Sequence, residues 1–220
     1  MNKIVLFDLD GTLLDTLGDL TEAVNYALRC ANMPPRTPAE VRSFVGNGAR
    51  KLIERSLGEG ATEELIDICI KDFSEFYKSN YAVKTEAYDG MLECVDKLLA
   101  RGIRCGVVTN KLHDISVDLC AKFFPGRFEE VVGDLPDMPR KPDPAKVLKM
   151  IEKLGGGSAL YVGDSWVDVQ TAKNAKIPCV LLSWGFNSRA RLLEEGAEYI
   201  VDNADRLFNK IIELQNDKIC

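Results

Sequence analysis

Short apolar runs that end in polar residues recur along this chain and constrain its fold more than any other feature. The runs are rich in Val, Ile and Leu and too short for helices: Ile4–Phe7, Ile103–Val108, Ala159–Val162, Cys179–Leu182 and, more weakly, Phe128–Val132. Largely apolar runs of this length are typical of strands that are buried on both faces of a parallel sheet.

Helical patterns separate these runs. Apolar residues recur at helical spacing in Gly90–Arg101, Pro144–Leu154, Ser165–Ala175 and Ala204–Gln215. The first ends at Gly102 and the second begins with a proline, as helices commonly do. Strands that alternate with helices predict an α/β fold with a Rossmann-like parallel sheet and right-handed crossovers.

The alternation breaks between residues 15 and 83, where no good strand is found. Four helices are predicted there instead: Leu17–Ala31, Pro38–Phe44, Ala49–Leu57 and Thr62–Asn80. We therefore predict an all-helical domain, residues 15–83, inserted after the first strand. Residues 1–14 and 84–220 would form the Rossmann-like core.

Composition and charge argue against several binding partners, namely nucleic acid, membrane and zinc. The net charge of −6 argues against nucleic-acid binding, which calls for a basic surface. No apolar run approaches the roughly 20 residues of a membrane span. The seven cysteines form no C-x-x-C pair and only one histidine is present, so a zinc site is not expected and the thiols are expected to be reduced. We expect a cytoplasmic protein that is a monomer or a homodimer.

The polar residues that end the strands are the chemical signal. Asp8 and Asp10 follow the first run, Thr109 and Asn110 follow the second, and Asp164 follows the third, with Asp168 one helical turn later. Because ligands of open α/β sheets bind outside the carboxyl ends of the strands, these side chains should converge on one crevice.

Four converging carboxylates would repel one another unless a cation lay between them. Oxygen ligands favour Mg²⁺, so Asp8, Asp10, Asp164 and Asp168 are candidate metal ligands. The alternative is that Asp164 and Asp168 only begin a helix, where Asp is favoured. Lys141, set between Arg140 and Pro142, is a candidate to offset carboxylate charge and hold a phosphoryl oxygen.

These segments resemble the four motifs of the haloacid dehalogenase-like hydrolase superfamily. They are Asp8-Leu9-Asp10-Gly11-Thr12-Leu13, Thr109-Asn110, Lys141-Pro142 and Gly163-Asp164-Ser165-Trp166-Val167-Asp168. Each motif is weak alone, but four in this order at strand ends make the resemblance specific, and it covers essentially the whole chain. The helical insert is similar to the small cap domain of that superfamily.

The resemblance implies a role for each residue. Asp8 would be the nucleophile and Asp10 the general acid and base, and Thr109, Asn110 and Lys141 would hold the phosphoryl group. Mg²⁺ would bind Asp8, Asp164 and the backbone carbonyl of Asp10, with Asp168 nearby, directly or through water. Asp10 favours phosphate esters over haloalkanoic acids, because an alkoxide leaving group needs a proton and a halide does not.

Further stretches resemble bacterial phosphoglycolate phosphatases. They are Asp15–Leu20, Val24–Leu28, Phe44–Leu52, Trp184–Phe186 and Gly196-Ala197. The expected substrate is a small phosphorylated metabolite, with 2-phosphoglycolate the first candidate and a phosphosugar mutase or pyrophosphatase as alternatives. In the cap, Gly46 permits close approach of a ligand, and Arg50 or Lys51 could pair with a substrate carboxylate. An ordinary loop with solvated basic residues is the other interpretation of that stretch.

Overall fold

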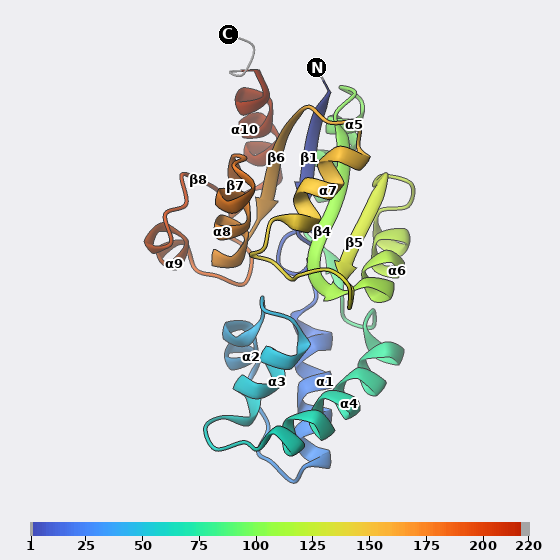
Figure 1. The fold of residues 1–220 in the computed structure, drawn as a ribbon, viewed down its shortest axis with the longest axis vertical. Coiled ribbons are helices and arrows are strands. Elements are labelled where there is room, and N and C mark those ends of the chain that lie inside the picture. The colour runs from blue at the N-terminus through green and yellow to red at the C-terminus, as the bar shows by residue number, and fades with distance from the viewer. Residues whose placement is uncertain (1, 217–220) are drawn as a thin grey trace.

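A computed structural model describes residues 2–216 and arranges them as a sheet-based core and a smaller helical unit (Figure 1). The strands are β1 Lys3–Phe7, β2 Leu14–Asp15, β3 Glu86–Ala87, β4 Arg104–Leu112, β5 Glu130–Asp134, β6 Ser158–Gly163, β7 Cys179–Leu182 and β8 Tyr199–Val201. The helices are α1 Leu17–Cys30, α2 Pro38–Phe44, α3 Ala49–Leu57, α4 Glu63–Asn80, α5 Met91–Leu99, α6 His113–Phe123, α7 Ala145–Lys153, α8 Trp166–Ala175, α9 Arg189–Glu194 and α10 Ala204–Asn216.

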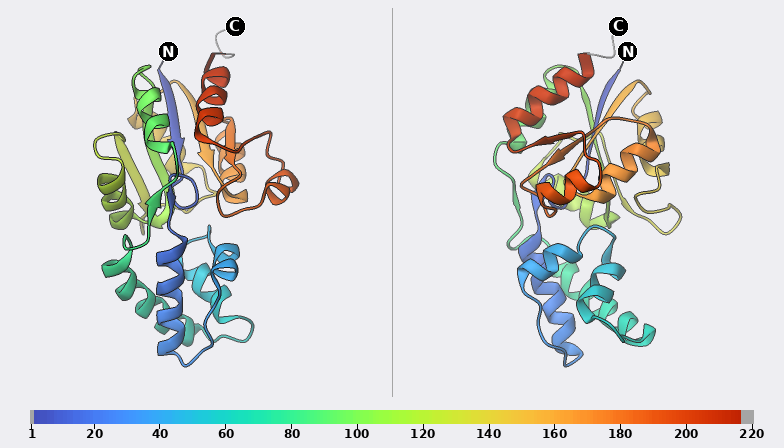
Figure 2. Two further views of the ribbon diagram at one scale, coloured as in Figure 1. Left: turned by 180° about the vertical axis from the view of Figure 1, so that it is seen from behind. Right: turned by 90° about the vertical axis from the view of Figure 1, so that its left-hand side faces the viewer.

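The core sheet has the strand order β5-β4-β1-β6-β7-β8, and all neighbouring strands are parallel. Successive residues of β1 face opposite sides, as a strand requires. Ile4 and Leu6 pack with α7 and α8, whereas Val5 and Phe7 pack on the side of α5, α6 and α10 (Figure 2). The predicted α/β fold with a Rossmann-like parallel sheet is confirmed.

Helices α1 to α4 form the helical unit, which we call the cap. Its apolar faces share one core, with Val24, Ile53, Cys69 and Phe73 buried. The Thr37 side chain accepts a hydrogen bond from the backbone of Glu40, whose own side chain accepts one from the Thr37 backbone, so α2 begins with a capping box. The inserted cap is helical, as predicted.

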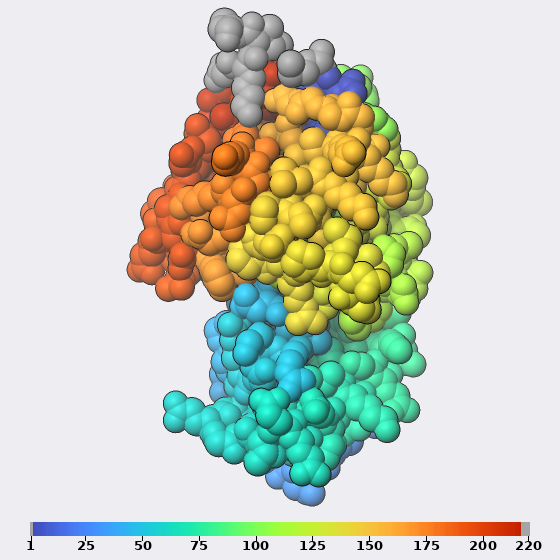
Figure 3. Space-filling model, in the orientation of Figure 1, coloured from blue at the N-terminus to red at the C-terminus, as the bar shows by residue number. Residues whose placement is uncertain are grey.

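Two chain crossings join the cap to the core. β2 and β3 pair at the crossings as a short antiparallel ribbon. The buried Asp19 carboxylate accepts hydrogen bonds from the backbones of Val83, Lys84 and Thr85 and from the Thr85 hydroxyl. Both crossings are thereby fastened to each other. The space-filling view in Figure 3 shows the cap, coloured blue to teal, below the core and in contact with it. The ribbon includes residue 15 and begins on its second strand three residues after residue 83, and the predicted domain boundaries at residues 15 and 83 stay a prediction.

Five elements were not predicted: α6, α9, β8 and the two-residue strands β2 and β3. Ile115, Val117 and Leu119 in α6 alternate with polar residues, a strand-like period that obscures the helix. β8 has only three residues and α9 only six, too few for a pattern to emerge. β5 also begins two residues later than the predicted Phe128–Val132 run.

The six described cysteines are all free thiols. Four are buried as small core residues, namely Cys69, Cys94, Cys105 and Cys120. Burial raises the pKa of Cys94 to about 12, so this thiol stays protonated. Cys220 lies outside the described residues. Within residues 2–216, no helix has both the length and the apolar character needed to cross a bilayer.

Candidate active site

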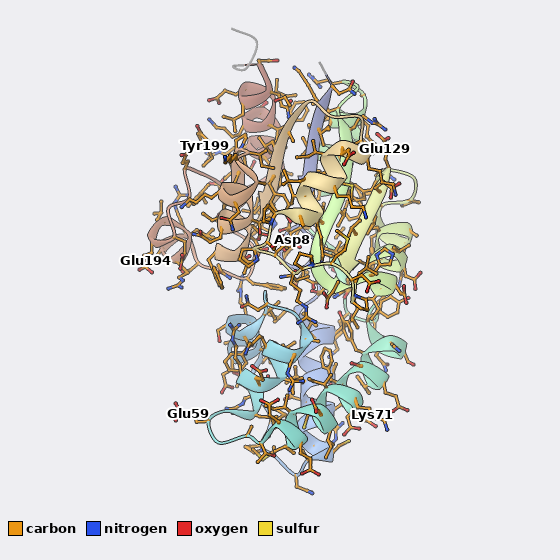
Figure 4. All side chains as sticks on the ribbon, viewed as in Figure 1. Asp8, Glu59, Lys71, Glu129, Glu194 and Tyr199 are labelled. Carbon is orange, nitrogen blue, oxygen red and sulfur yellow. The ribbon has the colours of Figure 1, made fainter. Side chains whose placement is uncertain are left out.

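Three buried carboxylates meet at the edge of the sheet that faces the cap. Asp8 directly follows β1, Asp164 directly follows β6, and Asp168 lies in the first turn of α8. One oxygen of each lies within 4.8 Å of the other two. Figure 4 shows Asp8 at this edge, between the sheet and the cap. The structure thus brings together three of the four predicted carboxylates.

Glycines leave room for these carboxylates. A Cβ on Gly163 would overlap the Asp168 side chain, and a Cβ on Gly11 or Gly185 would overlap that of Asp164. Gly11 also has a φ of +80°, where a side chain is disfavoured. The close packing of backbone against carboxylate therefore depends on these positions having no side chain.

Lys141 brings a positive charge into the cluster. Its Nζ lies 2.9 Å from Asp8 Oδ1 and 2.8 Å from Asp168 Oδ1. Asn110 holds the backbone of Lys141 on both sides, because its Oδ1 accepts from Lys141 N at 2.8 Å and its Nδ2 donates to the Lys141 carbonyl at 3.0 Å. The lysine is therefore fixed to the carboxyl end of β4 as well as to the carboxylates.

Asp168 uses both of its oxygens within the protein. Oδ1 pairs with Lys141, while Oδ2 accepts from Ser165 N at 3.0 Å and from Ser165 Oγ at 2.6 Å. The Asp164 backbone N–H also donates to Oδ2, at 3.2 Å. Asp168 therefore positions both the lysine and the loop that carries Asp164.

The electrostatics of the cluster call for more positive charge than Lys141 supplies. Burial raises the pKa of Asp8 to about 6, although Lys141 opposes the shift. Burial, followed by repulsion from Asp168 and Asp8, raises the pKa of Asp164 well above its usual range. Asp8 Oδ1 is buried, and Lys141, at 2.9 Å, is its charged neighbour within the described chain. A divalent cation that prefers oxygen ligands fits this donor set.

Thr109 and Asn110 lie where the sheet becomes irregular. Pairing between β4 and β5 shifts register between Val108 and Leu112, and both side chains within this stretch are buried. Irregular pairing of this kind is common beside active sites, where it redirects side chains. The stretch lies at the same sheet edge as Asp8.

The Asp10 side chain is held apart from the cluster. Its Oδ1 accepts hydrogen bonds from Thr16 Oγ1 at 2.7 Å and from Lys111 Nζ at 2.8 Å. Its Oδ2 has no hydrogen-bond partner in residues 2–216, and the side chain is 14% exposed and lines a cavity. One oxygen of Asp10 is thus anchored and the other is open to a ligand.

The cavity lies between core and cap and has a volume of about 320 Å³, within the usual range for small-molecule sites. The core contributes Asp8, Asp10 and Thr109 to its wall, and the cap contributes Gly46 and Arg50. Asn110 Nδ2 also donates to the Gly46 carbonyl at 3.2 Å, which ties the cap loop to β4.

The model of the haloacid dehalogenase-like hydrolase family matches residues 5–182. The chain belongs to this family. Phosphoglycolate phosphatase 1 of Pseudomonas aeruginosa is 35% identical over 209 residues, which cover 91% of this chain and 76% of that protein. The phosphoglycolate phosphatase of Mesorhizobium japonicum is 33% identical over 219 residues, covering 96% and 95%.

Solved structures agree with this membership. A predicted phosphoglycolate phosphatase from Haemophilus somnus has a TM-score of 0.86 at 29% identity, covering 95% of this chain and 97% of that one. A Lactobacillus delbrueckii protein has a TM-score of 0.91 at 30% identity, covering 96% and 99%. As a haloacid dehalogenase-like hydrolase with phosphatase relatives over most of its length, the chain is a phosphoric monoester hydrolase.

Sequence reasoning missed a hydrogen-bonded pair of residues in this hydrolase's cavity wall. Lys111 Nζ donates to the hydroxyl of Tyr77, on α4 of the cap, at 2.6 Å. Burial alone would lower the pKa of Lys111, but Asp10 and Tyr77 outweigh it and raise the pKa, so the ammonium stays charged. The position of Lys111, directly after Thr109-Asn110 in an apolar strand, could have marked it as a site residue. Its contact with Tyr77, 34 residues earlier in the chain, could not be inferred from the sequence.

Arg50 reaches the cavity but is already paired within the cap. Its guanidinium lies 2.7 Å from Asp67 and 3.3 Å from Glu54, and it also pairs with Glu63. The Arg50 side chain is 37% exposed. Its predicted pairing with a substrate carboxylate stays a prediction. To make that pair, Arg50 would have to release at least one of these three carboxylates.

Proposed function

We propose that this haloacid dehalogenase-like hydrolase is a Mg²⁺-dependent phosphatase that acts through an aspartyl phosphate on Asp8. The observation that carries the proposal is the buried Asp8 carboxylate, which lies 2.9 Å from Lys141 and within 4.8 Å of the carboxylates of Asp164 and Asp168. The best candidate substrate is 2-phosphoglycolate, supported by relatives that bear the name phosphoglycolate phosphatase at 35% and 33% identity.

The metal would be held by the side chains of Asp8 and Asp164 and by the backbone carbonyl of Asp10. Asp168 would act directly or through water, and its bonds to Lys141 and Ser165 favour an orienting role. Bound there, Mg²⁺ would supply positive charge against the phosphoryl oxygens and relieve repulsion among the carboxylates.

The reaction would run in two displacements on phosphorus. In the first, an Asp8 carboxylate oxygen forms a bond to phosphorus, the bond from phosphorus to the ester oxygen breaks, and Asp10 gives that oxygen a proton. In the second, Asp10 takes a proton from water while the water oxygen attacks phosphorus. Inorganic phosphate leaves and the Asp8 carboxylate is restored.

Thr109, the backbone amide of Asn110 and Lys141 would hold the phosphoryl group through both steps. Charge in the transition state gathers on the phosphoryl oxygens, so fixed donors and cations supply most of the catalysis. Thr109 and Asn110 are buried at the irregular part of β4, and Lys141 is fixed by Asn110 and Asp168. Gly46 and Arg50 line the cavity on the cap side, and Arg50 is the sequence-based candidate for pairing with a substrate carboxylate.

A screen of phosphate esters with Mg²⁺ tests this function. Phosphoglycolate, glucose phosphates, pyrophosphate and nucleotides should be compared by kcat/KM for phosphate release. We expect phosphoglycolate to rank first and phosphate to appear without a bisphosphate activator. Activity that requires such an activator would indicate a mutase, and preference for pyrophosphate would indicate a pyrophosphatase.

A further inference from the structure

Lys111 has a hydrogen-bonding capacity that the fold does not use up. Its ammonium has three N–H donors. Within residues 2–216 they reach two acceptors, Asp10 Oδ1 at 2.8 Å and the Tyr77 hydroxyl at 2.6 Å. The side chain is 4% exposed and lines the cavity. One N–H of a buried, charged lysine is therefore available to a ligand.

Tyr77 offers a second donor at the same place. Its hydroxyl oxygen accepts from Lys111, so its own proton can go to another acceptor, and no protein acceptor for it is found in the described chain. Tyr77 is 2% exposed and also lines the cavity. A stacked contact with Phe73, with ring centroids 5.3 Å apart, fixes the ring. A cationic donor from the core and a neutral donor from the cap thus stand side by side.

The position of this pair relative to Asp10 defines what it can bind. Under the proposed mechanism, Asp10 protonates the ester oxygen, and Lys111 is bonded to that same carboxylate. A group on the carbon next to the ester oxygen would therefore lie within reach of Lys111 and Tyr77. Two adjacent donors carrying one positive charge match the two oxygens of a carboxylate.

We propose that Lys111 and Tyr77 form the carboxylate subsite of this enzyme. The inference rests on the proposed function and names its substrate class: phosphate monoesters whose ester-bearing carbon also carries a carboxylate. Arg50 is the competing candidate, but its guanidinium is shared among Glu54, Glu63 and Asp67. Lys111 needs to release nothing in order to donate its third N–H.

The experiment compares 2-phosphoglycolate with ethyl phosphate, in which a methyl group replaces the carboxylate and the ester is unchanged. The ratio of kcat/KM for the two substrates isolates recognition of the carboxylate, because damage to Asp10 or to the shared chemistry cancels. Wild type, Lys111→Met, Tyr77→Phe and Arg50→Ala should be measured together. Tyr77→Phe keeps the ring and the Lys111–Asp10 pair, so it is informative even if Lys111→Met fails to fold.

We expect wild type to prefer phosphoglycolate. Lys111→Met should reduce the preference by about 10- to 100-fold and Tyr77→Phe by about 3- to 10-fold, as charged and neutral hydrogen bonds predict. Arg50→Ala should retain it. Preference kept in Tyr77→Phe and lost in Arg50→Ala would overturn the subsite alone. A wild-type enzyme without the preference would overturn the proposed substrate, and the subsite with it.

Discussion

At the scale of single residues, the neighbours of each aspartate determine what it can do. Asp8 is buried beside the Lys141 ammonium and close to the carboxylates of Asp164 and Asp168, as suits a nucleophile and metal ligand. Both oxygens of Asp168 accept hydrogen bonds, from Lys141, from Ser165 and from the Asp164 backbone. Asp10 anchors one oxygen and leaves the other toward the cavity. Identical side chains are thus suited to three different tasks.

Replacing Asp8 by Asn should abolish turnover without unfolding the protein. Asn has nearly the same shape, but a neutral amide is a poor nucleophile for phosphorus and a poor ligand for Mg²⁺. Phosphate release should fall to background while the circular dichroism spectrum and the unfolding midpoint stay close to wild type. Wild-type rates in a folded variant would exclude Asp8 as the nucleophile.

Removing divalent metal should also abolish activity. Asp8, Asp164 and Asp168 form a buried acidic cluster, and burial with mutual repulsion already raises the pKa of Asp8 and of Asp164. EDTA should stop phosphate release and Mg²⁺ should restore it. Ca²⁺ should restore it poorly, because its coordination is larger and looser. Full activity in excess chelator would contradict the metal assignment.

At the scale of elements, the ends of the parallel strands made much of the site predictable. Asp8 and Asp164 each follow a short apolar run, and parallel strands bring such positions to one edge. The contact between Lys111 and Tyr77 was not predictable, since it depends on how α4 packs against β4. A pattern within one element carries no information on which distant element will face it.

Gly163→Ala tests the packing at the end of β6. The added Cβ would overlap the buried Asp168 carboxylate, which would have to move away from Lys141 and Ser165. We expect Mg²⁺ affinity and kcat/KM to fall by about 10- to 100-fold, as for residues that orient metal ligands. Calorimetric Mg²⁺ titration and steady-state kinetics would measure this.

Gly18→Ala is the matched control for that substitution. Gly18 lies in α1, and a Cβ there would come within 3.0 Å of Lys84 Cβ, a close contact that involves none of the site carboxylates. The preference of helices for alanine and the close contact with Lys84 oppose each other, so the free energy of unfolding should change by less than about 1 kcal/mol, with activity unchanged. Equal losses of kcat/KM in both variants would show that activity is sensitive to any added methyl group. The loss in Gly163→Ala could then not be attributed to displacement of Asp168.

At the scale of the whole molecule, the site exists only where cap and core meet. The sequence indicated a helical insert after the first strand, yet the contacts that place it are tertiary. They include the hydrogen bond from Asn110 to the Gly46 carbonyl and one from Arg42 to the Gly185 carbonyl. Such contacts join residues with no common pattern, which is why the cap could be predicted and its placement could not.

Asp19→Ala should loosen the connection between the two units. The buried carboxylate accepts hydrogen bonds from the backbone N–H groups of Val83, Lys84 and Thr85, and these groups would lose their acceptor. We expect the free energy of unfolding to fall by about 3 kcal/mol, the order expected for unpaired buried donors. Asp15→Ala removes one exposed bond to Leu17 N and should cost less than about 1 kcal/mol. Guanidinium titrations would compare them, and similar losses would refute the role of Asp19.

The central claim is that phosphate passes through Asp8, and trapping the intermediate tests it most directly. In Asp10→Asn with p-nitrophenyl phosphate, the leaving group departs without a proton, while the second step lacks its base. We predict a burst of about one nitrophenolate per enzyme. Borohydride reduction followed by mass spectrometry should then find homoserine at position 8, and Asp8→Asn should give neither signal. Continued nitrophenolate release from Asp10→Asn with position 8 unmodified would contradict the account.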